Sequence, residues 1–441
     1  MIDSGSTGGF RRDALQLSAA RLSSVAALFG VNVAAARLLE AQAVGAVAVG
    51  QTVGLLAAML ANGGLNISTI FFLRRPPTER DTVAGALLAL AGASCAVAIL
   101  AALASAPIVF ATVLGSPDWA LLLAAALMAA GMIAFEFTGA VLLAIDRVGR
   151  FTLQELGRGW GSLAAVILAL VVLPRPEAVL LGLAVGYAAG AALGWVWSRR
   201  TVRLVPRVDA AFSREALAFG LRGQAGNILQ YVGLRLDLLL VPAFLTLQAG
   251  GLYFVAVRVS DAVGQIGTAA SSLLFPRVAA EDDRSETRLT ERVARMTILG
   301  VAVVAALIGV AADPLLRVVF GGEYATGATA LQVLLAGVVP LSLCRVLVAD
   351  LKGRGRPGLA SLGSMAMAVA TVALDIVLIP AWGLVGAAVA SLLGYGLGAV
   401  ALAAAYHRVT HGALLALVPR WSDVRELTAL VGYAWRARAA E

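Results

Sequence analysis

Six arginines of this chain fall inside long apolar stretches, where charged side chains are rare and usually functional. A guanidinium group stays charged, and its planar fork binds two oxygens of a phosphate. Arg21, Arg258 and Arg345 are therefore predicted to line a cavity, with the alternative that each only neutralises a carboxylate. A cavity lined by arginines suits an anionic head group such as a lipid diphosphate, whereas a cation site would favour carboxylates and aromatic rings.

Polar residues also form stripes at helical spacing. At about 100° per residue, Asn227 and Arg235 share one helix face, and Arg258, Asp261 and Gln265 share a face farther along the chain. Such stripes should face protein or water and not lipid. Their side-chain amides either make hydrogen bonds between helices or form part of a substrate site. Arg258 and Asp261 can form an ion pair, which is either structural or reorganised by a proton or ion. The candidate substrate-binding residues are Arg21, Arg258, Arg345, Asp261, Arg235, Asn227 and Gln265.

Other reactive side chains are sparse. Cys95 and Cys344 lie in separate apolar stretches and are predicted to be packing residues, because one cysteine in each half offers no zinc or redox spacing. His407 and His411 are four residues apart without a third ligand nearby, so we predict no metal site. The sequence shows no paired carboxylates or nucleotide-binding motif. We therefore predict no catalytic residue, no cofactor and no enzymatic activity.

The composition predicts a membrane protein. Of the 441 residues, 60% are hydrophobic and 14% are charged, whereas soluble proteins are about a quarter charged. The net charge is +8, but the basic residues form short clusters between apolar stretches, as in polytopic membrane proteins. No continuous basic face is visible, so we predict no nucleic-acid partner. Asp350 and Asp375 fall near the ends of apolar stretches and are predicted to be interfacial.

About twelve stretches are long enough to span a bilayer, which needs roughly 20 apolar residues. With the N-terminus in the cytoplasm, the inner segments carry 25 arginines and lysines and the outer segments carry 3. This asymmetry predicts an even number of spans and two cytoplasmic termini. The predicted spans are 14–38, 41–66, 82–105, 119–145, 151–173, 177–198, 215–241, 247–274, 292–312, 327–350, 358–380 and 383–406.

Short motifs recur between the two halves of the chain at a nearly constant offset. Because each half has six spans, the halves share one orientation, which predicts a parallel pseudo-two-fold repeat with a substrate site between the halves. The fold class is therefore an all-α integral membrane protein with two six-helix lobes. The matching pairs, at offsets of 206, 206 and 208, are Gln42–Gly45 with Gln248–Gly251, Gly149–Arg150 with Gly355–Arg356, and Gly186–Ala191 with Gly394–Ala399.

The domain prediction follows from this repeat. Residues 1–198 form the first lobe, 199–215 a cytoplasmic linker, 216–408 the second lobe and 409–441 a cytoplasmic tail. The tail bears arginines and either lies on the membrane surface or is solvated.

The second half resembles the polysaccharide-transporter, O-antigen flippase-like family of the multidrug/oligosaccharidyl-lipid/polysaccharide exporter superfamily. The resemblance covers about 190 residues of the second half, and the first half matches only by topology and spacing. The residues that carry it are Leu234–Asp237, Gly250–Ala256, Phe275–Pro276, Phe320–Tyr324, Gly353–Pro357 and Ile379–Ala388.

The resemblance implies a flippase of a bacterial inner membrane. It would move an undecaprenyl-diphosphate-linked oligosaccharide from the cytoplasmic to the periplasmic leaflet by alternating access, for cell-surface polysaccharide biosynthesis. It also implies H⁺ or Na⁺ as a coupling ion, contacts with membrane lipids, and polymerase or glycosyltransferase partners. The main alternative is an ion-coupled multidrug/cation antiporter of the same superfamily. A non-transporting partner in envelope assembly remains a further alternative.

Overall fold

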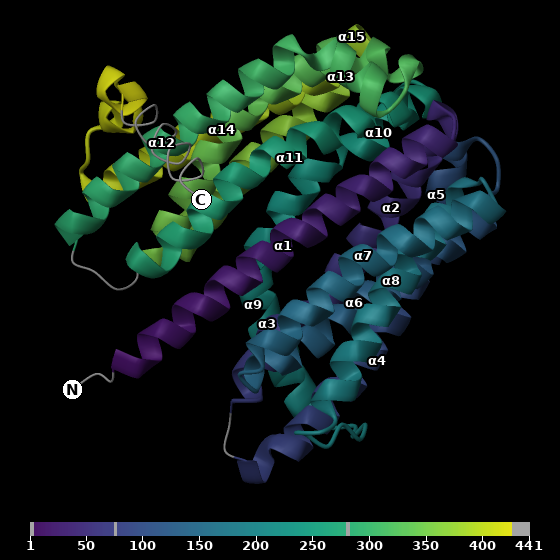
Figure 1. The fold of residues 1–441 in the computed structure, drawn as a ribbon, viewed down its shortest axis with the longest axis vertical. Helices are drawn as coiled ribbons and strands as arrows, with labels where there is room; N and C mark the ends of the chain where they lie inside the picture. Colours follow the sequence, from purple (N-terminus) through teal and green to yellow (C-terminus); the bar gives the residue numbers. More distant parts are fainter. Residues whose placement is uncertain (1–3, 75–76, 279–282, 426–441) are drawn as a thin grey trace, which may run out of the picture. The chain divides into compact units, whose positions relative to one another are not determined.

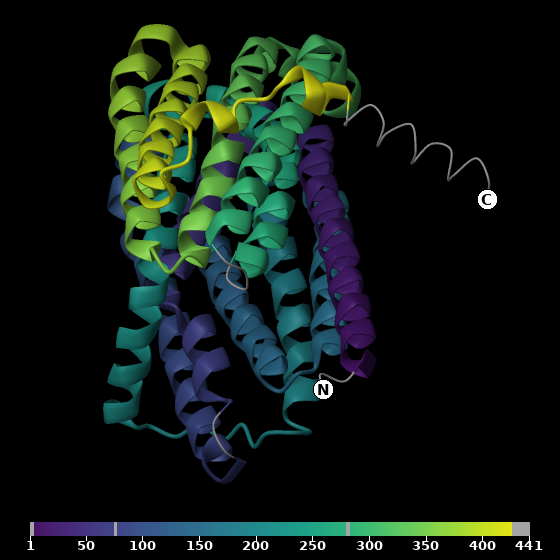
Figure 2. The same ribbon diagram turned by 90° about the vertical axis from the view of Figure 1, so that its left-hand side faces the viewer.

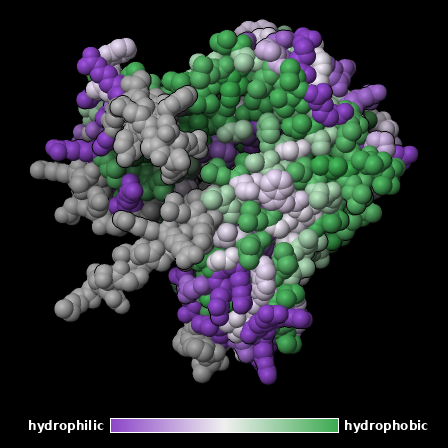
Figure 3. Space-filling view, viewed as in Figure 1, coloured by the Kyte–Doolittle hydropathy of each residue, from purple (hydrophilic) through white to green (hydrophobic). Residues whose placement is uncertain are grey.

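The computed structural model describes residues 4–74, 77–278 and 283–425, which form helices with no β-strand among them (Figure 1). This confirms the predicted all-α fold. Hydrophobic side chains cover long stretches of the helix flanks, while hydrophilic side chains gather near helix ends (Figure 3). Such a surface suits a lipid environment. Residues 426–441 of the predicted tail lie outside the described residues.

By their contacts, the helices fall into two compact units. Unit 1 comprises Met1–Ile228 with Thr246–Gly251, and unit 2 comprises Leu229–Leu245 with Leu252–Glu441. The helix α9 (Ala210–Arg235) begins in unit 1 and ends in unit 2. The other helices of unit 1 are α1 (Ser4–Leu38), α2 (Ala41–Asn62), α3 (Leu65–Phe72), α4 (Pro77–Ala104), α5 (Ala106–Val109), η1 (Phe110–Leu114), α6 (Trp119–Ala144), α7 (Val148–Val172) and α8 (Pro176–Ser198).

Unit 2 holds the remaining helices, of which α11 has its first residues in unit 1. Within unit 2, α12 and α15 both pack against α14 (Figures 1 and 2). The helices are α10 (Asp237–Phe244), α11 (Leu247–Val278), α12 (Asp283–Val310), α13 (Ala312–Val319), η2 (Gly322–Gly327), α14 (Ala328–Gly353), α15 (Pro357–Thr410) and η3 (Leu414–Leu417).

The start of α9 belongs to unit 1 because it packs on α3. Ser68 Oγ donates a hydrogen bond of 2.6 Å to the carbonyl oxygen of Ala216, and the rings of Phe71 and Phe219 stack with centroids 4.4 Å apart. The contact boundary therefore falls inside α9 and not in the linker at 199–215. The predicted lobe boundaries describe membrane topology rather than contacts, and they stay a prediction.

Nine helical segments of the described chain are long and apolar enough to cross a membrane. One of them, α15, has 54 residues and consists of two helices joined at a kink, so it supplies two spans. The helices α9 and α11 have 26 and 32 residues, but they carry arginines in mid-helix that lower their apolar character. With these included, the arrangement agrees with the predicted twelve spans.

The kink in α15 lies at Gly383, whose φ and ψ are 61° and −136°. Residues with a side chain rarely adopt a positive φ, because their Cβ atom then clashes with the backbone. Glycine lacks that atom. Pro380 precedes the kink and removes a backbone hydrogen-bond donor from the helix. The two residues together explain why the predicted spans end at 380 and restart at 383.

A contact within unit 1 reproduces the sequence repeat. A Cβ atom on Gly45 would collide with the backbone of Leu247, and one on Gly251 would collide with the backbone of Ala41. Gly45 and Gly251 are separated by 206 residues, as are Ala41 and Leu247. The two contacts are therefore equivalent under the repeat. Glycine at both positions allows the starts of α2 and α11 to touch backbone to backbone.

Candidate functional site

Three charged residues of α9 and α11 form an ion-pair cluster in unit 2. Both Arg235 Nη2 and Arg258 Nη1 approach Asp261 Oδ2, at 2.8 and 3.5 Å. The guanidinium carbon of Arg258 also lies 4.4 Å from the ring centroid of Phe254. The predicted pair between Arg258 and Asp261 thus forms, but Arg235 is the closer partner. The carboxylate of Asp261 therefore neutralises part of the charge of two guanidinium groups, and this attraction holds the three side chains together.

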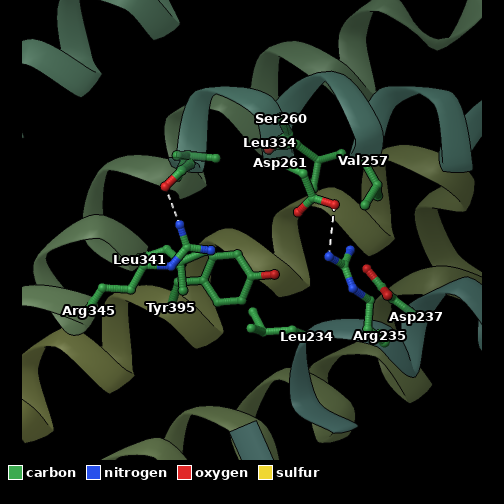
Figure 4. A pocket seen from close by; sticks show the side chains of 12 residues that line it. Leu234, Arg235, Asp237, Val257, Ser260, Asp261, Leu334, Leu341, Arg345 and Tyr395 are labelled. Carbon is green, nitrogen blue, oxygen red and sulfur yellow. Dashed lines mark hydrogen bonds and ion pairs between the residues drawn. The ribbon is translucent and has the colours of Figure 1, made fainter. Parts of the chain in front are cut away.

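A small cavity of about 30 Å³ lies beside this cluster (Figure 4). Arg235, Asp237 and Asp261 lie at one end of it, and Arg345 and Tyr395 lie at the other. A water molecule needs roughly 10–15 Å³ of such space, so this cavity holds at most about two or three waters. It is too small for a diphosphate or a sugar, and we interpret it as a hydrated gap among the charges.

Arg345, on α14, donates a hydrogen bond to the carbonyl oxygen of Gly264 on α11. A Cβ atom at position 264 would lie 2.9 Å from Arg345 Nη1, so glycine makes room for the guanidinium group. In the described residues, no carboxylate lies within ion-pair distance of Arg345, in contrast to Arg235 and Arg258. A cation without a carboxylate partner inside the membrane is the chemical setting in which an anionic ligand adds most stabilisation.

Arg345 also lines a larger groove of about 560 Å³. Its polar lining comes from three helices of unit 2, and no carboxylate is among the described lining residues. Two cations, Arg345 and Lys352, lie seven residues apart on α14 and therefore on one face, roughly 10 Å apart along the helix axis. The other polar lining residues are Gln230, Thr268, Ser271 and Ser272.

The hydroxyl groups of this groove bond to their own helix. Thr268, Ser271 and Ser272 each donate to the carbonyl oxygen four residues earlier, at 3.4, 2.7 and 3.0 Å. These bonds leave the oxygen lone pairs open, and a hydroxyl rotates readily to donate to a ligand instead. The groove therefore combines two cations with adaptable donors, which is suited to phosphate oxygens.

The structure separates the seven predicted site residues. Arg235, Asp261 and Arg345 surround the small cavity, and Arg345 alone of them reaches the larger groove. Arg258 joins the cluster through Asp261 but lines neither space. Gln265 is half-buried on α11 and also lines neither.

The two remaining predicted residues lie elsewhere. Asn227 belongs to α9, but its side chain lies outside the described part of the structure. Arg21 lies in unit 1 and lines a different cavity. Sequence reasoning did not select Lys352, although it is the chain's one lysine and follows Arg345 by two helical turns. That spacing is the signal that would have found it.

Two aspartates that were predicted to be interfacial are buried within the protein, and their depth in a membrane stays a prediction. Asp350 is fully buried, where it accepts hydrogen bonds from Thr290 Oγ1 at 2.6 Å and Arg354 Nε at 2.9 Å. Asp375 is 1% exposed, and neither carboxylate oxygen has a hydrogen-bond partner among the described residues. The two halves of α15 pack closely on each other, because Gly394 and Gly398 lie against Thr371 and Met367.

A third buried acid also belongs to unit 2. Asp237 is 3% exposed and accepts hydrogen bonds from Tyr253 Oη and from the backbone N–H of Leu238, both at 2.8 Å. Its helix, α10, packs against α15, which carries Asp375. The hydroxyl of Ser391, also on α15, is fully buried beside Tyr253 and Tyr395. Such a set of oxygens is suited to a proton or a small cation.

Helices of spanning length with buried charges in mid-helix define a multi-pass membrane protein. The chain matches the family described as polysaccharide biosynthesis protein over residues 34–328, more than half of its length. It therefore belongs to this family, and the resemblance drawn from its motifs is confirmed.

One curated relative is the probable low-salt glycan biosynthesis flippase Agl15 of Haloferax volcanii, 30% identical over 170 residues. The match covers 37% of this chain and only 36% of that protein, so the chain matches about a third of the relative's length.

Two solved structures share the fold. The lipid II flippase MurJ in an inward closed conformation superposes with a TM-score of 0.71, at 12% identity over 89% of this chain and 87% of that one. An inward-facing multidrug resistance transporter of the MATE family superposes with a TM-score of 0.75, at 13% identity over 89% of this chain and 98% of that one. At such low identity these likenesses show the fold alone.

Proposed function

We propose that this protein is a flippase that moves a lipid-diphosphate-linked oligosaccharide across a membrane by alternating access, for cell-surface polysaccharide biosynthesis. Family membership supports the link to polysaccharide synthesis. The name of the Haloferax volcanii relative supports a flippase over an enzyme. The observation that carries the proposal is the groove that contains Arg345 and Lys352 without a carboxylate among its described lining residues.

The groove suits a diphosphate for electrostatic reasons. A charge inside the membrane is unfavourable unless it is paired, and among the described residues Arg345 has a carbonyl oxygen and not a carboxylate as its partner. A diphosphate would supply the missing negative charge and accept two parallel hydrogen bonds from the guanidinium fork. A multidrug antiporter for cations would need the opposite lining, which disfavours that alternative here.

We propose the direction and location of transport from the family resemblance together with the charge distribution. The 25-to-3 excess of basic residues on one side supports cytoplasmic termini. The resemblance implies a bacterial inner membrane, with loading from the cytoplasmic leaflet and transport toward the periplasm. Glycosyltransferases would act before this transport step, and a polymerase would act after it.

The buried acids support coupling to an ion gradient. Burying a charged carboxylate without a partner is strongly unfavourable, so Asp375 should bind a proton or a cation such as Na⁺. Asp237 and Ser391 would complete the oxygen set. Binding or release would alter the packing of α10 against α15 and so bias one conformation over another.

A genetic experiment tests the proposed function. Deleting the gene should abolish surface polysaccharide and cause the lipid-linked precursor to accumulate in the inner leaflet. The wild-type gene should restore export, whereas R345A should not restore it at equal membrane abundance. Full export by R345A would show that the groove is not needed for transport. An unchanged amount of surface polysaccharide after the deletion would refute the proposed function.

A further inference from the structure

A separate cavity of about 330 Å³ lies within unit 1. Side chains of α1, α3, α6, α7 and α8 line it, and all of them belong to the same compact unit. Its charged lining residues are two arginines and two glutamates, namely Arg21, Arg158, Glu136 and Glu155. The cavity is therefore chemically unlike the groove of unit 2, whose described lining residues include two cations and no carboxylate.

Arg158 is fixed at the wall of this cavity. Its Nη2 atom lies 2.8 Å from Glu155 Oε2 and 3.0 Å from Ser24 Oγ. Its guanidinium carbon lies 5.2 Å from the ring centroid of Phe135 and 5.5 Å from that of Tyr187, within the range of cation–π attraction. The chain's own arginine thus occupies the place between carboxylate and aromatic rings that a cationic ligand would need.

The remaining polar groups offer both donors and acceptors. Glu136 accepts a hydrogen bond of 2.5 Å from Asn62, which leaves further acceptor capacity on its carboxylate. Asn66 Oδ1 accepts from the backbone N–H of Ile67 at 2.8 Å, so the amide NH₂ group can donate to a ligand. Arg21 adds a guanidinium group. Two positive and two negative side chains give the cavity no net attraction for an anion.

A balanced set of donors and acceptors beside apolar walls matches the chemistry of a sugar ring. Hydroxyl groups donate to carboxylates and accept from amides and guanidinium groups, while the C–H faces of the ring pack on apolar side chains such as Phe151 and Met132. The volume lies near the lower end of the usual range for ligand sites, roughly 300–1,000 Å³, which suits one or two sugar rings.

We propose that the cavity of unit 1 is a binding site for the pyranose rings of the transported glycan, distinct from the diphosphate groove of unit 2. This inference rests on the proposed function, because a lipid-linked glycan would bring sugars into contact with the helices that line this cavity. It assigns sugar recognition to Glu136, Asn66 and Arg21, with Arg158 as part of the wall.

Saturation-transfer difference NMR on the purified full-length protein tests the site directly. The probes are the methyl glycosides of glucose, galactose and N-acetylglucosamine, and the detergent is lauryldimethylamine oxide, which has no sugar head group to compete. At least one glycoside should receive saturation from the wild-type protein. Two variants should weaken this transfer by about tenfold or more: E136Q removes a charged acceptor, and M132W fills the cavity without changing its charge.

Two further variants separate this inference from the proposed function. E177Q makes the same chemical change as E136Q at a glutamate of α8 that pairs with Arg175 at 3.8 Å outside the cavity, and it should bind the glycosides normally. R345A should also bind them normally while losing affinity for undecaprenyl diphosphate. Wild-type affinity for undecaprenyl diphosphate in E136Q and M132W shows that they are folded. The sugar-site proposal would be refuted if none of the three glycosides received saturation, or if E136Q and M132W transferred as much saturation as the wild type. Neither result would affect the assignment of the diphosphate to the groove of unit 2.

Discussion

Replacing Arg345 by alanine should selectively weaken binding of undecaprenyl diphosphate. The guanidinium group lines the groove and has a carbonyl oxygen as its described partner, so removing it breaks no ion pair within the described residues. A hydrogen bond to a charged group contributes about 1.5–3 kcal/mol, and each 1.4 kcal/mol is a tenfold change in affinity. We therefore expect roughly a tenfold to hundredfold loss, and a smaller loss in R345K, which keeps the charge but not the fork.

The assay is equilibrium binding of undecaprenyl diphosphate to the purified protein in detergent. R317A is the matched control, because Arg317 pairs with Asp313 on the exposed side of α13 and lines neither the groove nor the small cavity. It removes the same charge from the same unit and should bind the lipid like the wild type. Wild-type affinity in R345A, or an equal loss in R317A, would refute the assignment of the diphosphate to this groove.

Three other perturbations have equally definite outcomes. G251L places a side chain where even a Cβ atom meets the backbone of Ala41, so thermal unfolding in detergent should shift to a clearly lower temperature; overpacking typically costs about 1–3 kcal/mol, and an unchanged midpoint would contradict the close contact. D375N removes a buried acid whose carboxylate has no hydrogen-bond partner in the described part of the chain, so lipid translocation in vesicles should no longer respond to an imposed Na⁺ or proton gradient. A retained response would exclude Asp375 from coupling. In single-cysteine variants, D209C should react with a membrane-impermeant maleimide only from the cytoplasmic side and G322C only from the periplasmic side, and the reverse pattern would invert the topology.

Much of the fold was predictable because it depends on local properties of the sequence. Apolar length and basic-residue asymmetry predict the spans, and the repeat of glycine-containing motifs predicts two similar halves. The contact between Gly45 and Gly251 shows why one such motif recurs: both positions need a residue without a side chain. The kink at Gly383 was likewise visible as a break between two predicted spans.

The site was only partly predictable, because helical spacing gives the face of a residue but not its partner. The stripe containing Arg258 and Asp261 was recognised, but the competition from Arg235 for the same carboxylate depends on how α9 and α11 pack. The burial of Asp375 depends on the fold of α15 upon itself, which no single stretch of sequence reveals. Lys352 was discoverable from its spacing to Arg345, and it was missed because it stands at a span end.

The most direct test of the central claim is lipid translocation by the purified protein in liposomes. Undecaprenyl diphosphate carrying a fluorescently labelled sugar is incorporated into both leaflets, and an impermeant reductant then bleaches the outer label. Wild-type protein should make the inner-leaflet label accessible as well, while R345A liposomes should lose only the outer-leaflet label, like protein-free liposomes. Protection of the inner label in wild-type liposomes both under an imposed Na⁺ gradient and under an imposed proton gradient would contradict the proposed flippase.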